Sequence, residues 1–354
     1  MIILNHITRK LSQKHKEVSH ILSSQERAGA GIILCAGGET LLVQAHFLLL
    51  SLETLGNDLP IEFFHYGDEV KQADKDLILS MYPTLSIQFV DLELKSFCVN
   101  KDVRGFQIKA YALLYTRFER VVYLDVDIIP LHLPLTYLNS SDFVTSGAVF
   151  FPDYWIYHSS NKQKTTMYMD SMQLIFKNLT NHTISNDTCE IESGFFVLHT
   201  VQHRNALSYF IALNDLHVFF FNFFYGDKEL LRLAFMLANE SFVVKPFYPN
   251  CIGSIIDNQF HGFGMVHMLS DTIISHIHMT ILHIFDINVP VNIVRKVHKH
   301  EKYINIKASE KASERNLVSI TFNNTNETEF FPIPTILEKI FTQFHRRHQY
   351  QKIQ

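Results

Sequence analysis

The sequence predicts an α/β fold with a mostly parallel central sheet flanked by helices. Strand-like and helix-like segments alternate between residues 31 and 130, which is typical of parallel sheets with helices on both faces. The first strand-like run ends in Gly37-Gly38, and the later run Val121 to Leu124 is apolar without alternating polarity. Such a β-branched and aromatic run suits a strand that is covered on both faces.

The first half of the chain carries the more regular pattern. Its expected elements are a strand at 31–36, a helix at 39–55, strands at 61–66 and 85–90, a helix at 105–118 and a strand at 121–124. Glycines after the first strand let a ligand approach the backbone closely, as in nucleotide-binding α/β domains. The turn is not G-x-G-x-x-G, so a plain tight turn fits the sequence equally well.

Two acids follow the apolar strand at 121–124. Asp125 and Asp127 stand at i and i+2, so their side chains point the same way in an extended segment. Open α/β sheets bind ligands beyond the carboxyl ends of their strands, and a hard divalent cation held there can clamp a diphosphate. The alternative is that the acids cap a helix or lie in a solvated turn.

The second half is less regular. Its expected elements are a strand at 143–151, an exposed polar insertion at 159–188, a strand at 195–199, helices at 202–213 and about 228–238, and a short strand at 242–247. A polar, stem-like helix is expected at 1–28 and an amphipathic helix at 334–354. The run Lys307 to Arg315 is polar and low in complexity, which indicates a linker or a flexible loop.

Composition narrows the class of protein. With 354 residues, 47% hydrophobic content and a net charge of −4, the chain is long and apolar enough for one large or two ordinary domains. The absence of a basic excess argues against a nucleic-acid partner, and the 30 Phe and 14 Tyr are assigned to core packing. No apolar run reaches the roughly 18 residues that span a bilayer.

N-glycosylation acceptors favour the lumen of the secretory pathway. Seven N-x-[ST] triplets begin at Asn139, Asn178, Asn181, Asn186, Asn239, Asn323 and Asn326. The four cysteines lack metal-ligand spacing and allow three disulfide pairings, and Cys35 is expected to be a buried small hydrophobe. Membrane association is expected only through an anchor outside this sequence.

Several short motifs occur in a fixed order between residues 31 and 283. They are Gly31-Ile32-Ile33-Leu34-Cys35-Ala36-Gly37, Gly67-Asp68-Glu69, Gln107-Ile108-Lys109-Ala110, Tyr123-Leu124-Asp125-Val126-Asp127, Phe151-Pro152-Asp153-Tyr154-Trp155, Glu192-Ser193-Gly194, Gly226-Asp227-Lys228-Glu229 and His278-Met279-Thr280-Ile281-Leu282. Together they resemble the fungal Golgi α-1,3-mannosyltransferase family and, more distantly, the glycogenin-like retaining transferases of the GT-A fold.

The resemblance implies a retaining enzyme that moves mannose from GDP-mannose to a hydroxyl of a glycan or glycoprotein, in α-1,3 linkage to a terminal mannose. It also implies a divalent cation, Mn²⁺ by preference, and action in the Golgi lumen. Asp125 and Asp127 match the metal-binding acids of the family, and His278 stands where relatives supply a third ligand. His276 and His283 lie close to His278 in the sequence, so the choice of histidine stays open.

The resemblance also assigns donor and catalytic residues. The expected donor contacts are Ala36, Gly37, Lys109, Asp125, Ser193 and Gly194. Asp227 and Glu192 are the candidate catalytic residues near the reacting carbon, whereas Asp153 and Trp155 are expected on the acceptor side. Each has an ordinary structural alternative: Lys109 as a solvated helix lysine, Asp227 as a helix cap, and Glu192 as a polar strand entry. His283 departs from the family pattern, in which a lysine often follows the leucine.

The expected domains are a stem-like helix at 1–28, a GT-A-like domain at 29–300 and a polar linker with a C-terminal helix at 301–354. The middle domain comprises a nucleotide-binding half at 29–130 and a less regular acceptor half at 131–300. Two other functions fit the same residues. One is a hexosyltransferase that uses a UDP-sugar, because a metal sees only the diphosphate; the other is a catalytically inactive glycan-binding relative.

Overall fold

The computed structural model describes residues 2–98, 101, 103, 105–156, 165–185, 188–224, 226–256, 259–279, 292–295, 305–308, 318–322 and 329–351. The chain divides into two compact units, which we describe separately. Unit 1 comprises Met1–Leu42, Asp58–Val126 and Pro134–Val244, and unit 2 comprises Val43–Asn57, Asp127–Leu133 and Lys245–Gln354.

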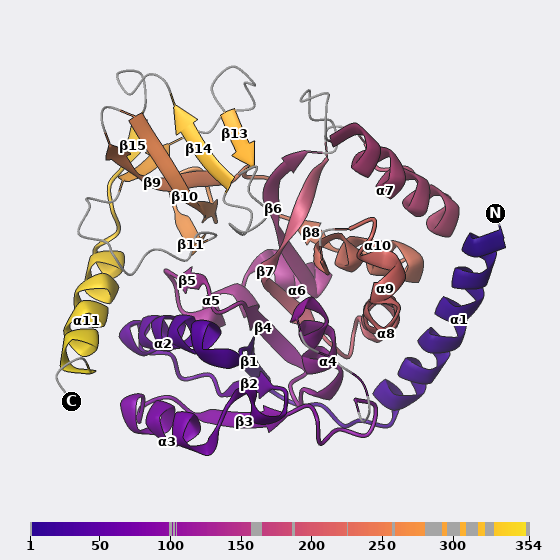
Figure 1. Cartoon of the computed structure of the whole chain (residues 1–354), viewed down its shortest axis with the longest axis horizontal. Coiled ribbons are helices and arrows are strands. Elements are labelled where there is room, and N and C mark those ends of the chain that lie inside the picture. Colours follow the sequence, from indigo (N-terminus) through magenta and orange to yellow (C-terminus); the bar gives the residue numbers. More distant parts are fainter. Residues whose placement is uncertain are drawn as a thin grey trace. The chain divides into compact units, whose positions relative to one another are not determined.

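Unit 1 is built around a seven-stranded sheet in the order β3-β2-β1-β4-β7-β6-β8 (Figure 1). Its strands are β1 (Ala30–Cys35), β2 (Ile61–His65), β3 (Ile87–Asp91), β4 (Arg120–Leu124), β6 (Ala148–Ile156), β7 (Cys189–His199) and β8 (Val243–Val244). The pairs among β3, β2, β1 and β4 are parallel, β7 is antiparallel to both β4 and β6, and β8 runs parallel to β6. The predicted, mostly parallel sheet is therefore confirmed.

Helices flank this sheet. They are α1 (Ile2–Ser23), α3 (Gln72–Met81), α4 (Ile108–Tyr115), α5 (Pro134–Leu138), α6 (Ser141–Ser146), α7 (Thr165–Thr180), α8 (Arg204–Asp215), α9 (His217–Phe220) and α10 (Lys228–Ala238), with the 3₁₀ turns η1 (Gly67–Glu69) and η2 (Gly105–Gln107). α4 packs on β1 and β2, α10 packs on β7, and α8 contacts α1, α4 and α10. The helix α2 (Gly38–Leu55) begins in unit 1 and continues into unit 2.

Adjacent aromatic residues of β7 show that both faces of the sheet are buried. Phe196 stacks on Tyr123 with ring centroids 4.9 Å apart, within the core that α4, α8 and α10 share. Phe195 points to the opposite face, where it meets Tyr137 of α5 at 4.7 Å. Because neighbouring residues of a strand face opposite sides, an unbroken apolar run is the pattern that such a sheet requires.

The start of β1 depends on a residue without a side chain. The ring of Phe118 lies 2.2 Å from the position that a Cβ on Gly31 would occupy. Phe118 precedes β4, and its ring is buried against the first strand. Any larger residue at 31 would have to displace this ring. Gly31 is thus fixed by close packing, whereas Gly37-Gly38 forms the turn into α2.

Unit 2 holds an antiparallel sheet in the order β13-β14-β10-β9-β12-β15, with β11 pairing both β10 and β5. Its strands are β5 (Ile128–Pro130), β9 (Asn250–Ile256), β10 (Gln259–Met268), β11 (Ile274–His278), β12 (Asn292–Arg295), β13 (Asn305–Ala308), β14 (Val318–Phe322) and β15 (Glu329–Phe331). α11 (Thr335–Gln351) packs on the second part of α2, where Phe344 meets Phe47 at 4.8 Å between ring centroids. The predicted C-terminal helix is therefore present.

Two expectations for the second half are wrong. Phe143 does not start a strand, because Ser140 caps α6 by accepting a hydrogen bond from the Phe143 N–H at 3.3 Å. That helix ends at Gly147, and the strand begins only at Ala148. The described part of the expected polar insertion is mostly α7, which buries Met172 and Phe176 in the core of unit 1 and so is not an exposed insertion.

Other boundaries shift by smaller amounts. The strand expected at 195–199 begins at Cys189, so the Glu192 motif lies inside β7 rather than before it. α1 is present, and it buries Leu11 and Val18 in the core shared with α8. Of the polar run expected as a linker, Lys307 and Ala308 belong to β13 and the remainder lies outside the described residues.

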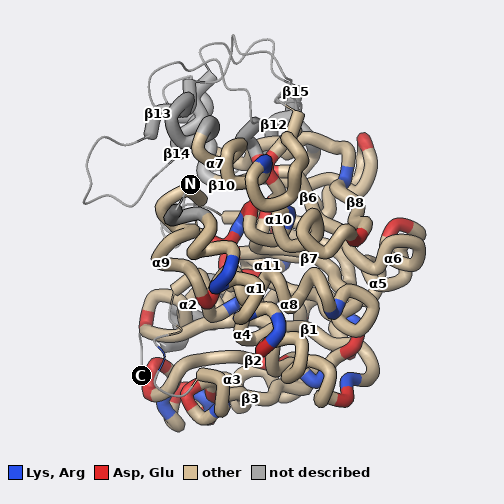
Figure 2. The backbone as a smooth tube through the Cα atoms, turned by 90° about the vertical axis from the view of Figure 1, so that its right-hand side faces the viewer, with Lys and Arg blue, Asp and Glu red and all other residues tan. Residues whose placement is uncertain are grey.

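Surface charge and hydropathy agree with the composition. Lys, Arg, Asp and Glu residues of both signs are interspersed along the described backbone (Figure 2). A search of the described helices found none with the length and apolarity that a bilayer span requires. Cys35 is buried as expected, and burial raises the pKa of its thiol to about 12.

Candidate functional site

A buried lysine joins two of the predicted site acids in unit 1. The Lys109 ammonium lies 3.2 Å from Asp125 Oδ2 and 3.0 Å from Asp227 Oδ2. It also donates a hydrogen bond to the Ser193 carbonyl oxygen at 2.7 Å. The side chain of Lys109 is 5% exposed, so the solvated-lysine alternative does not hold. We call Lys109, Asp125, Ser193 and Asp227 the lysine cluster.

Three members of the lysine cluster lie at the ends of different elements, and Ser193 lies within β7. Lys109 lies in the first turn of α4, Asp125 directly follows β4, and Asp227 immediately precedes α10. The Asp125 backbone N–H donates to the Gly194 carbonyl at 2.7 Å, which fixes Asp125 to β7. The cluster therefore sits at the carboxyl end of β4, where ligands of open α/β sheets bind.

Tyr123 completes the polar contacts of Asp125. Its hydroxyl donates to Asp125 Oδ1 at 2.7 Å, and Lys109 lies over its ring, 4.8 Å from the centroid. Burial raises the pKa of the Tyr123 hydroxyl, and the nearby Asp125 carboxylate raises it further. Both carboxylate oxygens of Asp125 are thus oriented by neighbouring side chains.

Opposing effects set the charge of Lys109. Burial lowers the pKa of its ammonium, but the carboxylates of Asp125 and Asp227 outweigh burial and raise that pKa above its usual value. Lys109 therefore stays cationic and holds two acids at a fixed separation. The prediction that Lys109 contacts phosphate stays a prediction, since in this arrangement its ammonium faces three protein oxygens.

Glu192 is buried and shapes the local backbone. Its carboxylate oxygens accept hydrogen bonds from the Gly194 N–H at 2.5 Å and the Phe195 N–H at 3.0 Å. These bonds fix the part of β7 in which the Ser193 carbonyl accepts a hydrogen bond from Lys109. A catalytic role for Glu192 stays a prediction beside this positioning role.

Asp227 is also buried, and it is not used as an ordinary helix cap. It occupies the position before α10, but its side chain makes no capping hydrogen bond to that helix. The Ser193 hydroxyl lies 3.4 Å from Asp227 Oδ1, on the same side as Lys109. The capping alternative for Asp227 is therefore not supported.

The glycine turn after β1 is closely packed. The Ala36 N–H donates to the Phe64 carbonyl at 3.1 Å, and a Cβ on Gly37 would meet the Glu69 carboxylate at 2.5 Å. Gly37 and the predicted motif at Gly67-Asp68-Glu69 therefore come together. Their predicted donor contacts are left as predictions.

Unit 2 contains the second predicted acid. Asp127 Oδ2 lies 3.2 Å from His278 Nε2, and the Met279 N–H donates to the Asp127 carbonyl at 2.9 Å. Antiparallel pairing of β5 with β11 places His278 opposite Ile128, the residue after Asp127. The two predicted metal ligands, which are far apart in the sequence, are neighbours in this unit.

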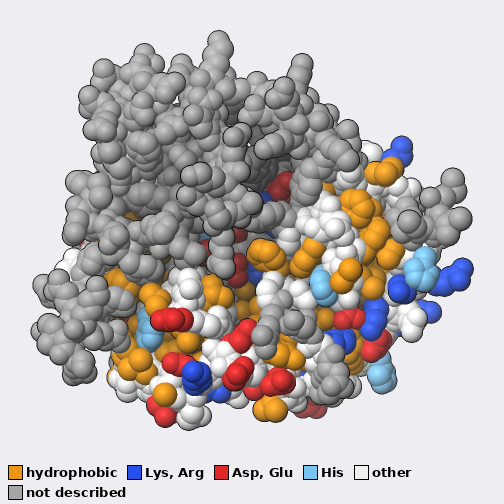
Figure 3. All heavy atoms as spheres, in the orientation of Figure 1, with side chains coloured by type: hydrophobic (Ala, Val, Ile, Leu, Met, Phe, Trp, Pro, Cys, Tyr) orange, Lys and Arg blue, Asp and Glu red, His pale blue; other side chains and the backbone are white. Residues whose placement is uncertain are grey.

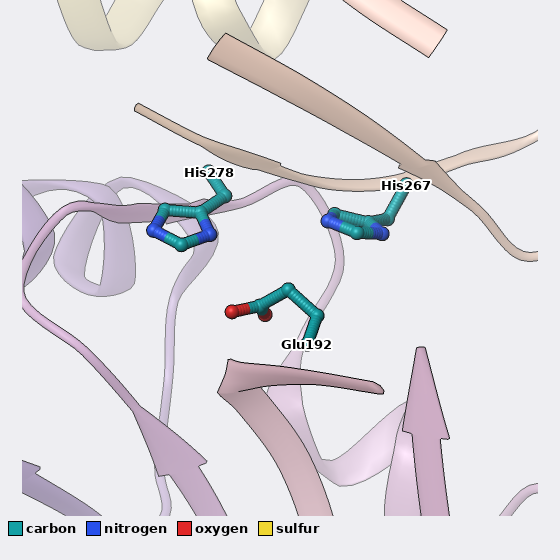
Figure 4. A group of neighbouring side chains, drawn as sticks. All are labelled: Glu192, His267 and His278. Carbon is teal, nitrogen blue, oxygen red and sulfur yellow. The ribbon is translucent and has the colours of Figure 1, made fainter. Parts of the chain in front are cut away.

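The neighbouring histidines differ in their surroundings. His276 is fully buried, and its ring stacks on that of His267 with centroids 4.5 Å apart. Figure 4 shows His267 and His278 on the same side of the paired strands β10 and β11. His283 lies outside the described residues. Of the two described candidates, His278 is the one in contact with Asp127.

The Asp127–His278 pair fits a divalent cation. Two adjacent ligands of an octahedral ion, each about 2.1 Å from it, lie about 3 Å apart. Within the described part of the chain, the buried Asp127 Oδ1 has no hydrogen-bond partner, which leaves a carboxylate oxygen to be satisfied. A carboxylate and an imidazole form a donor set that first-row divalent metals accept.

Asp153 lies in a buried ion network instead of standing alone. The Lys228 ammonium contacts Asp153 Oδ2 at 2.9 Å and Glu190 Oε2 at 2.7 Å. Burial lowers the pKa of Lys228, but these two carboxylates outweigh burial and raise it. The network ties the first residue of α10 to β6 and β7, next to Asp227. Of Trp155, only the backbone is described, as part of β6.

Sequence reasoning missed Tyr123 and Lys228 as polar partners. Tyr123 was assigned to the core on its apolar context, although a tyrosine two residues before an acid in a strand shares its face. Lys228 follows Asp227 in the quoted motif, but its partners lie on distant strands. Only the contact of Tyr123 could have been inferred from neighbouring residues in the sequence.

The comparisons with known proteins agree with the motifs. A family model described as "Mannosyltransferase putative" matches residues 29–269, more than half of the chain. The chain belongs to this mannosyltransferase family.

Named relatives carry two linkages. The chain is 23% identical to alpha-1,3-mannosyltransferase MNT2 of Saccharomyces cerevisiae over 66% of this chain and 47% of that protein. It is 22% identical to alpha-1,3-mannosyltransferase MNN1 of the same yeast, over 66% of this chain and 36% of that protein. With alpha-1,2-mannosyltransferase MNN21 of Candida albicans it shares 31% identity over 41% of this chain and 24% of that protein. The matches therefore span less than half the length of these relatives.

The solved structures that the chain matches include glycosyltransferases. GlyE of Streptococcus pneumoniae has a TM-score of 0.40 and 13% identity, covering 63% of this chain and 46% of that one. The galactosyltransferase LgtC, solved with donor and acceptor sugar analogues, also has a TM-score of 0.40 and 13% identity, covering 62% of this chain and 73% of that one. Such values do not support residue correspondences. The strand order and pairing of this chain confirm the expected α/β fold class, with a mostly parallel, helix-flanked sheet.

Proposed function

We propose that the chain is a retaining α-mannosyltransferase that transfers mannose from GDP-mannose to a hydroxyl of a glycan acceptor, with a divalent cation. The observation that supports this most is the lysine cluster, which fixes Asp125 and Asp227 around one buried cation at the carboxyl end of β4. Membership of the mannosyltransferase family supports mannose as the transferred sugar. Asp125 and Asp227 provide the carboxylates that binding of a charged donor requires.

The proposed roles follow from the chemistry of the donor. A departing nucleoside diphosphate accumulates negative charge as the glycosidic bond breaks, so catalysis requires positive charge at the leaving oxygens. A divalent cation bound by Asp127 and His278 would supply that charge. Asp125, oriented by Tyr123 and Lys109, is proposed to bind the donor. Asp227, held beside it, is proposed to contact the donor sugar or the acceptor hydroxyl.

Linkage is proposed as α-1,3. The α-1,3 relatives match over 66% of this chain, whereas the α-1,2 relative with 31% identity matches over 41%. The longer matches support α-1,3 transfer to a terminal mannose, and methylation analysis of the product decides between the linkages. Exposed N-glycosylation triplets support action in the Golgi lumen.

A donor panel tests the proposed function. The full chain is incubated with Mn²⁺, α-1,2-mannobiose and either GDP-mannose, UDP-glucose or UDP-galactose. We expect transfer from GDP-mannose alone, with retained anomeric configuration in the product and loss of transfer with EDTA. Preference for UDP-glucose would refute the mannose donor. Calorimetry that detects mannobiose binding without Mn²⁺-dependent GDP-mannose binding would indicate an inactive glycan-binding protein.

A substitution tests the proposed cation site. Asp127→Asn removes one carboxylate charge with little change of shape, so we expect Mn²⁺-dependent GDP-mannose binding and turnover to fall by roughly 100-fold or more. Calorimetry with Mn²⁺ and GDP-mannose gives the binding, and circular dichroism shows whether the fold is kept. The matched control is Asp271→Asn, an exposed acid of the same unit. Equal activity of the Asp127 variant and the control would exclude this cation site.

A further inference from the structure

Phe106 exposes a large aromatic ring beside the lysine cluster. It lies in η2, three residues before Lys109, and is 54% exposed. Many other phenylalanines of unit 1 are buried in its core. On the face shown in Figure 3, exposed apolar side chains form separate groups among polar ones. An exposed aromatic next to a candidate site is a feature of ligand-binding surfaces.

Gly226 links Phe106 to Asp227. A Cβ on Gly226 would lie 2.8 Å from the Phe106 ring, and Gly226 has a φ of +65°. Both the ring contact and the left-handed backbone require glycine here. The residue that follows is Asp227, so the ring of Phe106 packs on the segment that delivers this acid to Lys109. The ring of Phe106 and the candidate catalytic residue Asp227 are thus both positioned by the turn at Gly226.

A second ring extends the aromatic surface. Phe221, just after α9, makes an edge-to-face contact with Phe106, with ring centroids 6.3 Å apart. His217 packs on Phe221 at 5.7 Å, and the Gln107 amide nitrogen lies 3.4 Å from the His217 imidazole. We call Phe106, Phe221, His217 and Gln107 the aromatic cluster. It combines two apolar ring surfaces with the hydrogen-bonding groups of an imidazole and an amide, and it contains no carboxylate, ammonium or guanidinium.

We propose that the aromatic cluster binds a pyranose ring of the glycan acceptor. This inference rests on the proposed function, because it assigns the acceptor subsite of the same reaction. A pyranose has an apolar face of C–H groups, which packs on an aromatic ring, and a rim of hydroxyls, which bond to amide and imidazole groups. The aromatic cluster offers the exposed ring of Phe106 and the half-buried imidazole of His217, whereas the buried Gln107 amide contacts that imidazole.

The acceptor fits this cluster better than the donor nucleotide. The nucleotide is charged, whereas the aromatic cluster holds no carboxylate, ammonium or guanidinium; the lysine cluster contains charged groups. The predicted nucleotide turn at Ala36-Gly37 follows β1, whereas Asp227 contacts Ser193 of β7, and β4 lies between these two strands. Strands are about 4.8 Å apart, which separates β1 from β7 by roughly 10 Å. Phe106 packs against Gly226, the residue before Asp227.

Substitution of Phe106 tests the proposal. With saturating GDP-mannose and Mn²⁺, Phe106→Ala is expected to raise the KM for α-1,2-mannobiose by about 10-fold, which corresponds to the loss of about 1.4 kcal/mol of stacking. The KM for GDP-mannose is expected to change by much less than the KM for the acceptor. Phe106→Trp should keep acceptor binding, whereas Phe106→Leu, apolar but not aromatic, should not.

A binding measurement separates this subsite from the reaction itself. Saturation-transfer NMR of α-1,2-mannobiose is expected to show its ring C–H protons in contact with the wild-type chain and to lose that signal in Phe106→Ala. The control is Leu94→Ala, which removes an 80% exposed apolar side chain elsewhere in unit 1. Thermal unfolding of all variants excludes misfolding as the cause.

The outcomes distinguish the two proposals. A wild-type chain that transfers mannose, with Phe106→Ala unchanged in acceptor KM and NMR contact, overturns the aromatic subsite and leaves the function standing. A rise in the GDP-mannose KM alone assigns the ring to the guanine base and also overturns the subsite. A wild-type chain that neither hydrolyses GDP-mannose nor contacts mannobiose overturns both proposals.

Discussion

At the scale of single residues, Lys109 is the side chain on which the candidate site depends. Its cation offsets two carboxylates that would otherwise repel each other in a largely buried setting. Breaking such a pair leaves uncompensated buried charge, which costs several times more than an exposed ion pair contributes. Lys109 therefore has consequences for both folding and transfer.

Substitution of Lys109 should affect stability and transfer more than substitution of a surface lysine. We expect Lys109→Met to lower the unfolding free energy by about 3 kcal/mol and to lower transfer by roughly 100-fold or more. Urea unfolding followed by circular dichroism and a mannose-transfer assay measure the two effects. Lys177→Met, at an exposed position of α7, is the matched control. A Lys109 variant as stable as that control would contradict the role of the buried cation.

Residue-scale reasoning from the sequence recovered the acids better than their partners. Asp125 and Asp127 were found because a D-x-D at the end of an apolar strand is a local pattern. The contact between Lys109 and Asp227 joins α4 to α10, and no periodicity records which side chains meet across a fold. The contact of the Tyr123 hydroxyl with Asp125 was not predicted, because an aromatic ring in an apolar strand is typical of a core residue.

At the scale of elements, one acid fixes the N-terminal helix to the domain. Asp215, at the end of α8, forms ion pairs with Lys14 of α1 at 2.9 Å and with Lys101 at 2.8 Å, and it accepts a hydrogen bond from the Tyr111 hydroxyl at 2.7 Å. Together with buried Leu11 and Val18, these contacts hold α1 against α8. Sequence periodicity predicted the helix, but it did not predict where the helix docks.

Removing the Asp215 charge should loosen α1. Asp215→Asn loses two ion pairs and weakens one charge-assisted hydrogen bond, so we expect the unfolding free energy to fall by about 2 kcal/mol. Glu17→Gln is the control, because Glu17 pairs with the same Lys14 but is 46% exposed. That control should cost at most about 0.5 kcal/mol. Equal unfolding free energies for the two variants would exclude the proposed clamp.

The pH dependence of this contact has a defined sign. Burial raises the pKa of Asp215, but its bonds to Lys101, Lys14 and Tyr111 outweigh burial and hold the pKa below its usual value. The stabilisation is therefore complete above the unfolded pKa of about 3.9 and is lost as pH falls through the folded value. The difference between wild type and Asp215→Asn should be constant from about pH 7 to pH 5 and shrink below about pH 4. A difference that grows on acidification would contradict this sign.

At the scale of the whole molecule, the regular part of the fold was predictable and the irregular part was not. In β1 and β4 an apolar run coincides with almost complete burial, so local pattern and tertiary burial agree. Met172 and Phe176 of α7 lie within a polar, sequon-rich stretch, and their burial follows from a distant contact with α10. Phe143 has a different, local cause: Ser140 caps α6 and Gly147 ends it, so a helix forms where the residue types favour a strand.

The distribution of N-glycosylation triplets gives a prediction for the whole chain. Asn139, Asn178, Asn181 and Asn239 are all exposed. Glycans are bulky and need surface positions, so these asparagines satisfy the steric requirement for modification. Asn239 ends α10 with a φ of 54°, a conformation that asparagine tolerates better than most residues.

Expression through a yeast secretory pathway tests this exposure. We expect endoglycosidase H to increase the electrophoretic mobility of the secreted chain, and Ser241→Ala to remove one step of that shift. Replacing Ser241 rather than Asn239 destroys the triplet while keeping the asparagine that the left-handed helix end favours, so loss of the glycan is not confused with strain. Val144→Ala, an exposed substitution outside any triplet, should leave the pattern unchanged. A secreted chain whose mobility does not respond to the enzyme would contradict surface modification, and it would remove one support for a luminal site of action.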